Sequence, residues 1–133
     1  VMGSTSPWIE AVKKQAAIME WPTSVKVGVD NMAELMANSD LAIGAAGSTS
    51  WERCCLGLPT IMLVLADNQR DIANVLEDVG AALTFNINKL QAEPLALEQC
   101  IASAVPKMRA MSRVASAVTD GLGVTRLSKV LLR

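Results

Sequence analysis

The feature that most constrains the fold is an alternation of short apolar runs with segments of helical spacing. Residues 40–44 and 60–65 are short and almost continuously apolar, which is typical of strands buried on both faces. A polar turn and an amphipathic segment follow each run. Strands that alternate with helices in this way favour a parallel sheet. We therefore predict an α/β fold, Rossmann-like, with helices on both faces of the sheet.

The same patterns predict the secondary structure of the rest of the chain. Further strands are predicted at 25–29 and 82–85, and the helices at 7–19, 32–36, 49–56, 68–78, 93–105, 107–118 and 124–132. Residues 1–3 resemble the end of a strand that runs into a turn. A length of 133 residues is close to that of one typical domain. We therefore predict a single domain, with one core, over residues 1–133.

Composition excludes several classes of partner. The net charge is −1 with acidic and basic residues interspersed, so no basic surface is expected that would bind nucleic acid or an anionic membrane. No apolar run reaches the roughly 18 residues of a membrane span. The first residues do not have the pattern of a secretory signal. A cytoplasmic location is the expectation that follows.

Histidine is absent from the sequence. A Ser-His-Asp triad, a Cys-His pair and an imidazole metal site are therefore excluded within this chain. No catalytic residue and no metal site are predicted. The three cysteines, which include the adjacent Cys54 and Cys55, form no disulfide framework and are expected to be reduced. We predict that this pair packs in the core.

Two turns after predicted strands are rich in glycine and serine. They are Met2–Pro7 and Gly44–Ser50, the second with the sequence GAAGSTS. Ligands of parallel sheets bind beyond the carboxyl ends of the strands, and backbone amides in such turns can hold a phosphate. GAAGSTS lacks the lysine of a Walker loop and the spacing of GxGxxG. The two turns either bind a diphosphate between them or serve only packing.

Polar residues beside these turns are further candidates. Glu52 falls in the first turn of a predicted helix, where its carboxylate either accepts the two ribose hydroxyls, offsets the helix dipole or pairs with Arg53. Asp67, Asn68 and Gln69 follow the strand predicted at 60–65. They either face a sugar or phosphate, or Asn68 caps the next helix.

The stretch DLAIGAAGSTSWERCCLGLPTIMLVLADNQ, residues 40–69, resembles the UDP-sugar hydrolase family of pseudaminic-acid biosynthesis (UDP-2,4-diacetamido-2,4,6-trideoxy-beta-L-altropyranose hydrolase) and its relatives in spore-coat and flagellar polysaccharide operons. MGSTSP near the start resembles the first loop of that family's second domain. The family is similar in fold to GT-B glycosyltransferases, particularly the enzyme that adds N-acetylglucosamine to the lipid-linked peptidoglycan precursor. The resemblance implies the C-terminal domain of a GT-B two-domain fold.

The resemblance also implies a set of nucleotide-binding residues. They are Gly3, Ser4, Val29, Gly47, Ser48, Thr49, Glu52, Asn68 and Gln69. Glu52 would bind the ribose hydroxyls, the amides of residues 47–49 the diphosphate, and Val29 the uracil through its backbone. Residues 68 and 69 would reach the sugar or diphosphate. Ser4 and Thr5 stand where the family has a second glycine and an acidic residue, which is a departure in the first loop.

The expected function is UDP-sugar binding within a nucleotide-sugar hydrolase of pseudaminic-acid or related surface-polysaccharide biosynthesis. UDP or a UDP-sugar is the ligand, and no cofactor is expected. The resemblance places the catalytic histidine on an N-terminal domain of the same polypeptide, absent from this chain, so the chain alone is expected to be inactive. The alternatives are the nucleotide-binding half of a GT-B glycosyltransferase and a stand-alone nucleotide-binding module.

Overall fold

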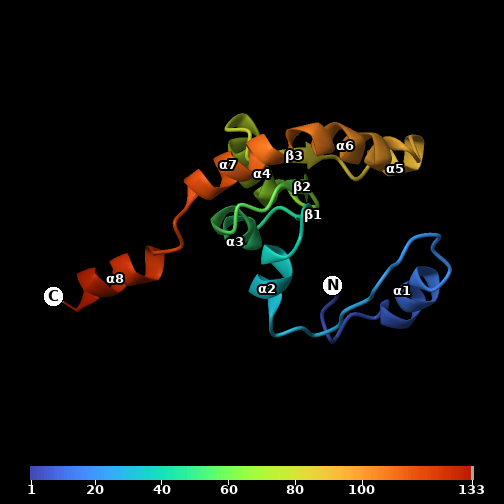
Figure 1. The fold of residues 1–133 in the computed structure, drawn as a ribbon, viewed down its shortest axis with the longest axis horizontal. Coiled ribbons are helices and arrows are strands. Elements are labelled where there is room, and N and C mark those ends of the chain that lie inside the picture. Colours follow the sequence, from blue (N-terminus) through green and yellow to red (C-terminus); the bar gives the residue numbers. More distant parts are fainter. Residues whose placement is uncertain (133) are drawn as a thin grey trace. The chain divides into compact units, whose positions relative to one another are not determined.

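A three-stranded parallel sheet organises the larger part of the molecule. The computed structural model describes residues 1–132 and forms two compact units, residues 1–32 and the chain from Ala33 onward. The sheet lies in the second unit, in the order β1 (Ala42–Ala45), β2 (Thr60–Leu63) and β3 (Ala82–Phe85) (Figure 1). Both pairings are parallel, which confirms the predicted α/β fold. The single domain over 1–133 stays a prediction.

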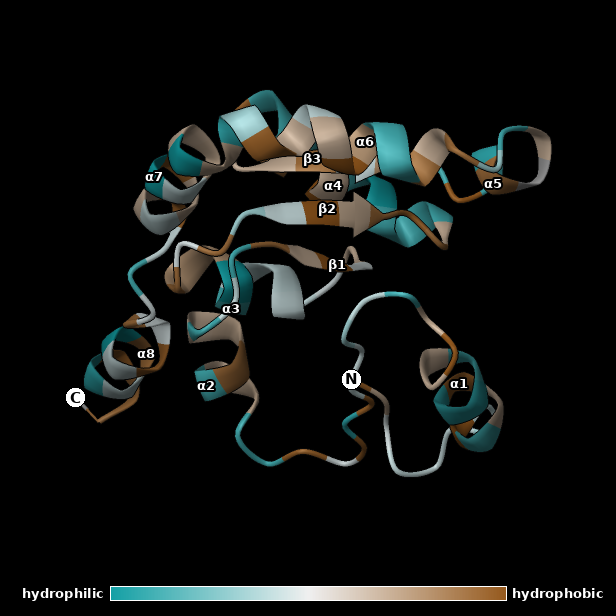
Figure 2. Ribbon diagram, turned by 45° about the vertical axis from the view of Figure 1, so that its right-hand side comes forward, coloured by the Kyte–Doolittle hydropathy of each residue, from teal (hydrophilic) through white to brown (hydrophobic). Residues whose placement is uncertain are grey.

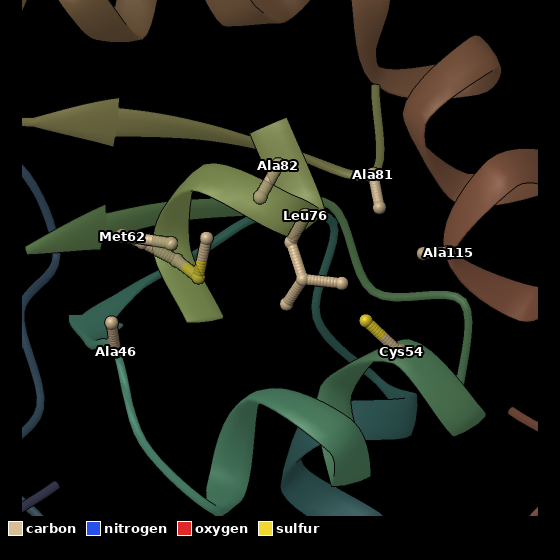
Figure 3. Close-up of a cluster of buried hydrophobic side chains, with 8 residues drawn as sticks. Ala46, Cys54, Met62, Leu76, Ala81, Ala82 and Ala115 are labelled. Atoms are coloured by element: carbon tan, nitrogen blue, oxygen red, sulfur yellow. The ribbon is translucent and has the colours of Figure 1, made fainter. Parts of the chain in front are cut away.

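Helices cover both faces of this sheet because successive side chains of each strand point to opposite sides. Ile61 and Phe85 belong to one buried cluster, with residues of α6 (Ala96–Ala104). Met62 and Ala82 belong to the other. That second cluster includes residues of α3 (Thr49–Cys55), α4 (Arg70–Asp78) and α7 (Met108–Val118) (Figure 3). The predicted helices on both faces are therefore confirmed.

The helix α3 is held closely against α7. Cys54 of α3 and Ala115 of α7 are buried in the same cluster. The turn after α3 contains Gly57 at φ +63°, where a Cβ atom would lie 3.3 Å from the Ser112 carbonyl oxygen. Cys55, by contrast, is exposed, so its predicted core position is wrong. α3 has one buried face only, and Cys55 lies on the other.

The remaining elements are α1 (Ile9–Ala16), α2 (Met32–Ala37), η1 (Asp67–Gln69), α5 (Lys89–Ala92), η2 (Val105–Lys107) and α8 (Gly123–Leu131). Of these, α1 is shorter than predicted, α2 and α8 agree with the predicted helices to within one residue at each end, and η1, α5 and η2 were not predicted as separate elements. Every residue of α8 is exposed although its sequence is amphipathic (Figure 2). Among the helices of residues 1–132, none has both the length and the apolar character needed to cross a bilayer.

The first unit contains α1 and one isolated bridge. Met2 and Val27 pair in parallel, with hydrogen bonds from the Met2 amide to the Lys26 carbonyl (2.8 Å) and from the Gly28 amide to the Met2 carbonyl (2.9 Å). The strand predicted at 25–29 is therefore wrong in extent, because one bridge is its only pairing in the described residues. Gly28, at φ +59°, lies close to Ser4: a Cβ atom there would be 3.3 Å from the Ser4 Cβ.

Candidate functional site

Two polar segments leave the sheet at the same edge. β1 and β2 are parallel neighbours, and Ala45 lies opposite Leu63 at their carboxyl ends. The Ala46 amide donates to the Leu63 carbonyl at 3.0 Å, and Ala46 is fully buried. The segment after β1 leads into α3, and the segment after β2 leads into η1 and α4. Ligands of parallel sheets bind at this edge.

The turn after β1 exposes backbone donors. Ser50 and Trp51 donate their amides to the carbonyls of Gly47 (2.9 Å) and Ser48 (3.1 Å), while the Gly47 amide donates to Ser50 Oγ at 3.2 Å. Ser48 and Thr49 are exposed, and their amides have no hydrogen-bond partner in the part of the chain that the structure describes. Adjacent amides of this kind can bind an anion.

Arg53 is the residue of this region that the sequence reasoning missed. Its guanidinium is buried, and Nη2 donates to the Ala45 carbonyl (2.8 Å) and to Ser50 Oγ (3.1 Å). Arg53 therefore supports the turn through the Ala45 carbonyl and the Ser50 hydroxyl, rather than through an ion pair with the Glu52 carboxylate. Burial lowers the pKa of Arg53, and the neighbouring Cys54 and Glu52 act in the opposite direction. One feature of the sequence did indicate this contact: Ser50 and Arg53 are three residues apart, so their side chains lie on the same face of a helix.

Gly44 makes room for this side chain. A Cβ atom at position 44 would lie 2.4 Å from Arg53 Nη1, so the guanidinium would have to move from its observed position. At Gly47 a Cβ atom would meet nothing within 4 Å. The two glycines of GAAGSTS therefore have different roles: the first admits the guanidinium, and the second lies in the turn itself.

Glu52 lies on the solvent side of α3. It is exposed and three residues after Thr49, so the two side chains share a face of the helix. Glu52 also borders an apolar groove of about 360 Å³. The groove is lined by Ala33, Met36, Trp51, Glu52, Cys55, Leu56, Thr119 and Gly121. The structure thus brings residues 47–49 and Glu52 together at the start of one helix.

The segment after β2 is more exposed to solvent than the turn after β1. Asn68 is exposed and lies inside η1, so it does not occupy the N-cap position of α4, which is that of Gln69. Gln69 Oε1 accepts the Leu65 amide at 3.0 Å, and Arg70 pairs with Asp67 at 2.9 Å. A polar cavity of about 360 Å³ lies beside this segment, with Asp67, Arg70, Asn74, Thr84, Asn86 and Asn88 among its lining residues.

Three predicted ligand residues lie in the first unit. The Gly3 carbonyl accepts the Ser6 amide at 3.1 Å, Ser4 is exposed beside Gly28, and Val29 is half-buried. The bridge between Met2 and Val27 brings the two predicted segments together. A site shared by these residues and the turn after β1 stays a prediction.

Comparison with known proteins gives a consistent result. Residues 11–122 match the model of the glycosyltransferase family 28 C-terminal domain. The chain is 32% identical, over 98% of its length, to the spore coat polysaccharide biosynthesis protein SpsG of Bacillus subtilis (strain 168), of which it covers 39%. A crystal structure of the glycotransferase of kitacinnamycin shares the fold, with a TM-score of 0.51 and 18% identity over 99% of this chain and 42% of that one. The chain belongs to the glycosyltransferase family 28 C-terminal domain family.

Proposed function

We propose that this chain is the nucleotide-binding domain of an enzyme that acts on UDP-sugars in surface-polysaccharide biosynthesis. The observation that carries the proposal is the turn after β1, where the amides of Ser48 and Thr49, which have no partner among the described residues, lie one helical turn from the Glu52 carboxylate. Amides bind phosphate oxygens, and a carboxylate accepts the two hydroxyls of a ribose. A nucleoside diphosphate has both groups.

The proposed contribution to the reaction is the stabilisation of the leaving UDP. When the bond between the sugar and the diphosphate breaks, negative charge increases on the phosphate oxygens. Fixed donors near those oxygens stabilise this charge without reorganisation. Proton transfer is not assigned to this chain, because it contains no histidine and Glu52 is assigned to the ribose. The groups that activate water or an acceptor belong to the rest of the enzyme.

We further propose hydrolysis as the reaction: water attacks the sugar, and UDP and the free sugar are released. The resemblance of residues 40–69 to the pseudaminic-acid pathway hydrolases supports this choice and its diacetamido sugar. The family's description as a glycosyltransferase domain favours a second candidate, transfer of the sugar to an acceptor. The chain spans about two fifths of the SpsG length, so both candidates are proposals for a longer protein.

Calorimetric titration of the 133-residue chain with UDP, UDP-N-acetylglucosamine and ATP tests the binding proposal. We expect both uridine nucleotides to bind and ATP to bind more weakly. ATP binding without UDP binding would contradict the proposal. For the reaction, UDP release from the longer protein is measured with and without an acceptor sugar. Release in water alone indicates hydrolysis, and release that requires the acceptor indicates transfer.

A further inference from the structure

The buried guanidinium of Arg53 is the polar group whose position demands an explanation beyond packing. The residue is only 6% exposed, and its Nε has no hydrogen-bond partner among the described residues. A buried cation is costly unless it is fully hydrogen-bonded. An apolar side chain of similar volume would fill the same space with no such cost. The charge therefore calls for a role.

The hydrogen bonds of Arg53 connect it to the exposed turn. Nη2 donates to Ser50 Oγ at 3.1 Å and to the Ala45 carbonyl at 2.8 Å. Ser50 Oγ also accepts the Gly47 amide at 3.2 Å. The guanidinium thus fixes the end of β1 directly and the turn through the Ser50 hydroxyl. Gly44 completes this arrangement, since any side chain there would collide with Nη1.

We propose that Arg53 is a positioning residue for phosphate binding. It holds residues 45–50 in the shape that leaves the Ser48 and Thr49 amides open, and it places a fixed positive charge behind the turn on which a diphosphate lies. This inference rests on the proposed function, because it assigns the phosphates of the nucleotide to this turn. The guanidinium does not touch the ligand; it acts through Ser50 and through its charge.

Burial makes this charge effective. Arginine stays protonated in proteins, and salt screens a buried charge much less than an exposed one. Its attraction therefore acts on an anionic ligand and leaves a neutral nucleoside unaffected. Loss of Arg53 should weaken binding in proportion to the phosphate charge. A residue that only stabilised the fold would affect all nucleosides and nucleotides alike.

The test is a titration with uridine, UMP and UDP, followed by NMR, on the wild-type chain, Arg53→Met, Arg53→Lys and the control Arg113→Met, which removes an exposed arginine of α7. In Arg53→Met we expect UDP affinity to fall about tenfold, because the turn loses two buried hydrogen bonds and the fixed charge behind it, with uridine affinity unchanged. Arg53→Lys keeps the charge and should give a smaller loss for UDP. Arg113→Met should behave as wild type.

Equal losses for uridine and UDP in Arg53→Met, or no loss for UDP, would overturn the positioning role. If Arg53→Met does not fold, the variant Ser50→Ala is used instead. It removes the hydrogen bond between Arg53 and Ser50 and keeps the guanidinium charge. If Ser50→Ala binds UMP and UDP more weakly and uridine as before, the proposal is supported. If the affinities for all three ligands are unchanged, or fall equally, it is overturned. A wild-type chain that binds UDP no better than uridine refutes the proposed function as well. A wild-type preference for UDP over uridine that is undiminished in Arg53→Met, or in Ser50→Ala where Arg53→Met does not fold, refutes the positioning role alone.

Discussion

The segments after β1 and β2 leave neighbouring parallel strands at the same edge, but they are built differently. The first is tied to the core by Arg53, which is buried and bonded to Ala45 and Ser50. The second is held by the Gln69 side chain and by an ion pair between Asp67 and Arg70. The side chains of that pair are 93% and 66% exposed, and exposed pairs contribute little to stability.

The difference separates a preformed part of the proposed site from an adaptable one. A diphosphate is common to all UDP-sugars, and a rigid turn can bind it without an ordering cost. The sugar varies between enzymes, and an exposed segment tolerates changes of sequence and conformation. We therefore propose that the diphosphate binds at the turn after β1 and the sugar at the segment after β2.

Thiol labelling gives the largest expected effect, because it compares the two faces of α3 directly. Cys55 is exposed, whereas Cys54 is buried under the first segment, and burial raises the pKa of the Cys54 thiol. In Cys100→Ser variants that keep one of the two cysteines, Cys55 should react at least about a thousandfold faster than Cys54, which requires unfolding of the core. Similar rates would mean that α3 opens readily and that the first segment is not rigid.

Two glycine variants test how much the contacts of Arg53 with the turn after β1 contribute to stability. Gly44→Ala places a Cβ atom 2.4 Å from Arg53 Nη1 and should lower the free energy of unfolding by about 2 kcal/mol, because the guanidinium must shift and its hydrogen bonds to Ala45 and Ser50 weaken. Gly47→Ala, where a Cβ atom meets nothing within 4 Å, is the matched control and should change it by less than about 1 kcal/mol. Urea denaturation measures both. Equal effects would show that Gly44 is not required by Arg53.

Glu52→Ala separates binding from stability. Glu52 is exposed on α3, so its removal should leave the melting temperature nearly unchanged. Loss of its proposed contacts to the ribose hydroxyls should weaken UDP binding about tenfold. Glu98→Ala, which removes an exposed acid of α6, is the control and should not affect binding. A large drop in melting temperature with intact UDP binding would assign Glu52 to the fold instead.

The smallest effect is expected in the second segment. Asp67→Asn removes the exposed pair with Arg70 and should change the free energy of unfolding by less than about 0.5 kcal/mol. Thermal unfolding at low and high salt checks this, and the difference from wild type should shrink further in high salt. A loss comparable with that of Gly44→Ala would remove the contrast between the two segments.

The sheet could be predicted because its signal is local. The buried strands are continuous apolar runs, and the bounds predicted for β3, 82–85, are those of the structure. The strand predicted at 25–29 was wrong in extent because pairing depends on a partner strand, which a valine alternation does not specify. Burial of Arg53 could not be predicted from residue type, since arginine is usually exposed. It depends on how closely β1 approaches α3, and only the tertiary structure gives that distance.

The central claim is that the turn after β1 binds the diphosphate of a uridine nucleotide. Backbone amide NMR of the 133-residue chain, titrated with UDP and in parallel with ATP, tests it most directly. We expect UDP to shift the amide signals of residues 44–52, with the largest changes at Ser48 and Thr49, and ATP to shift them less. Signals in this range that stay unchanged with UDP, or that move with ATP alone, would contradict it.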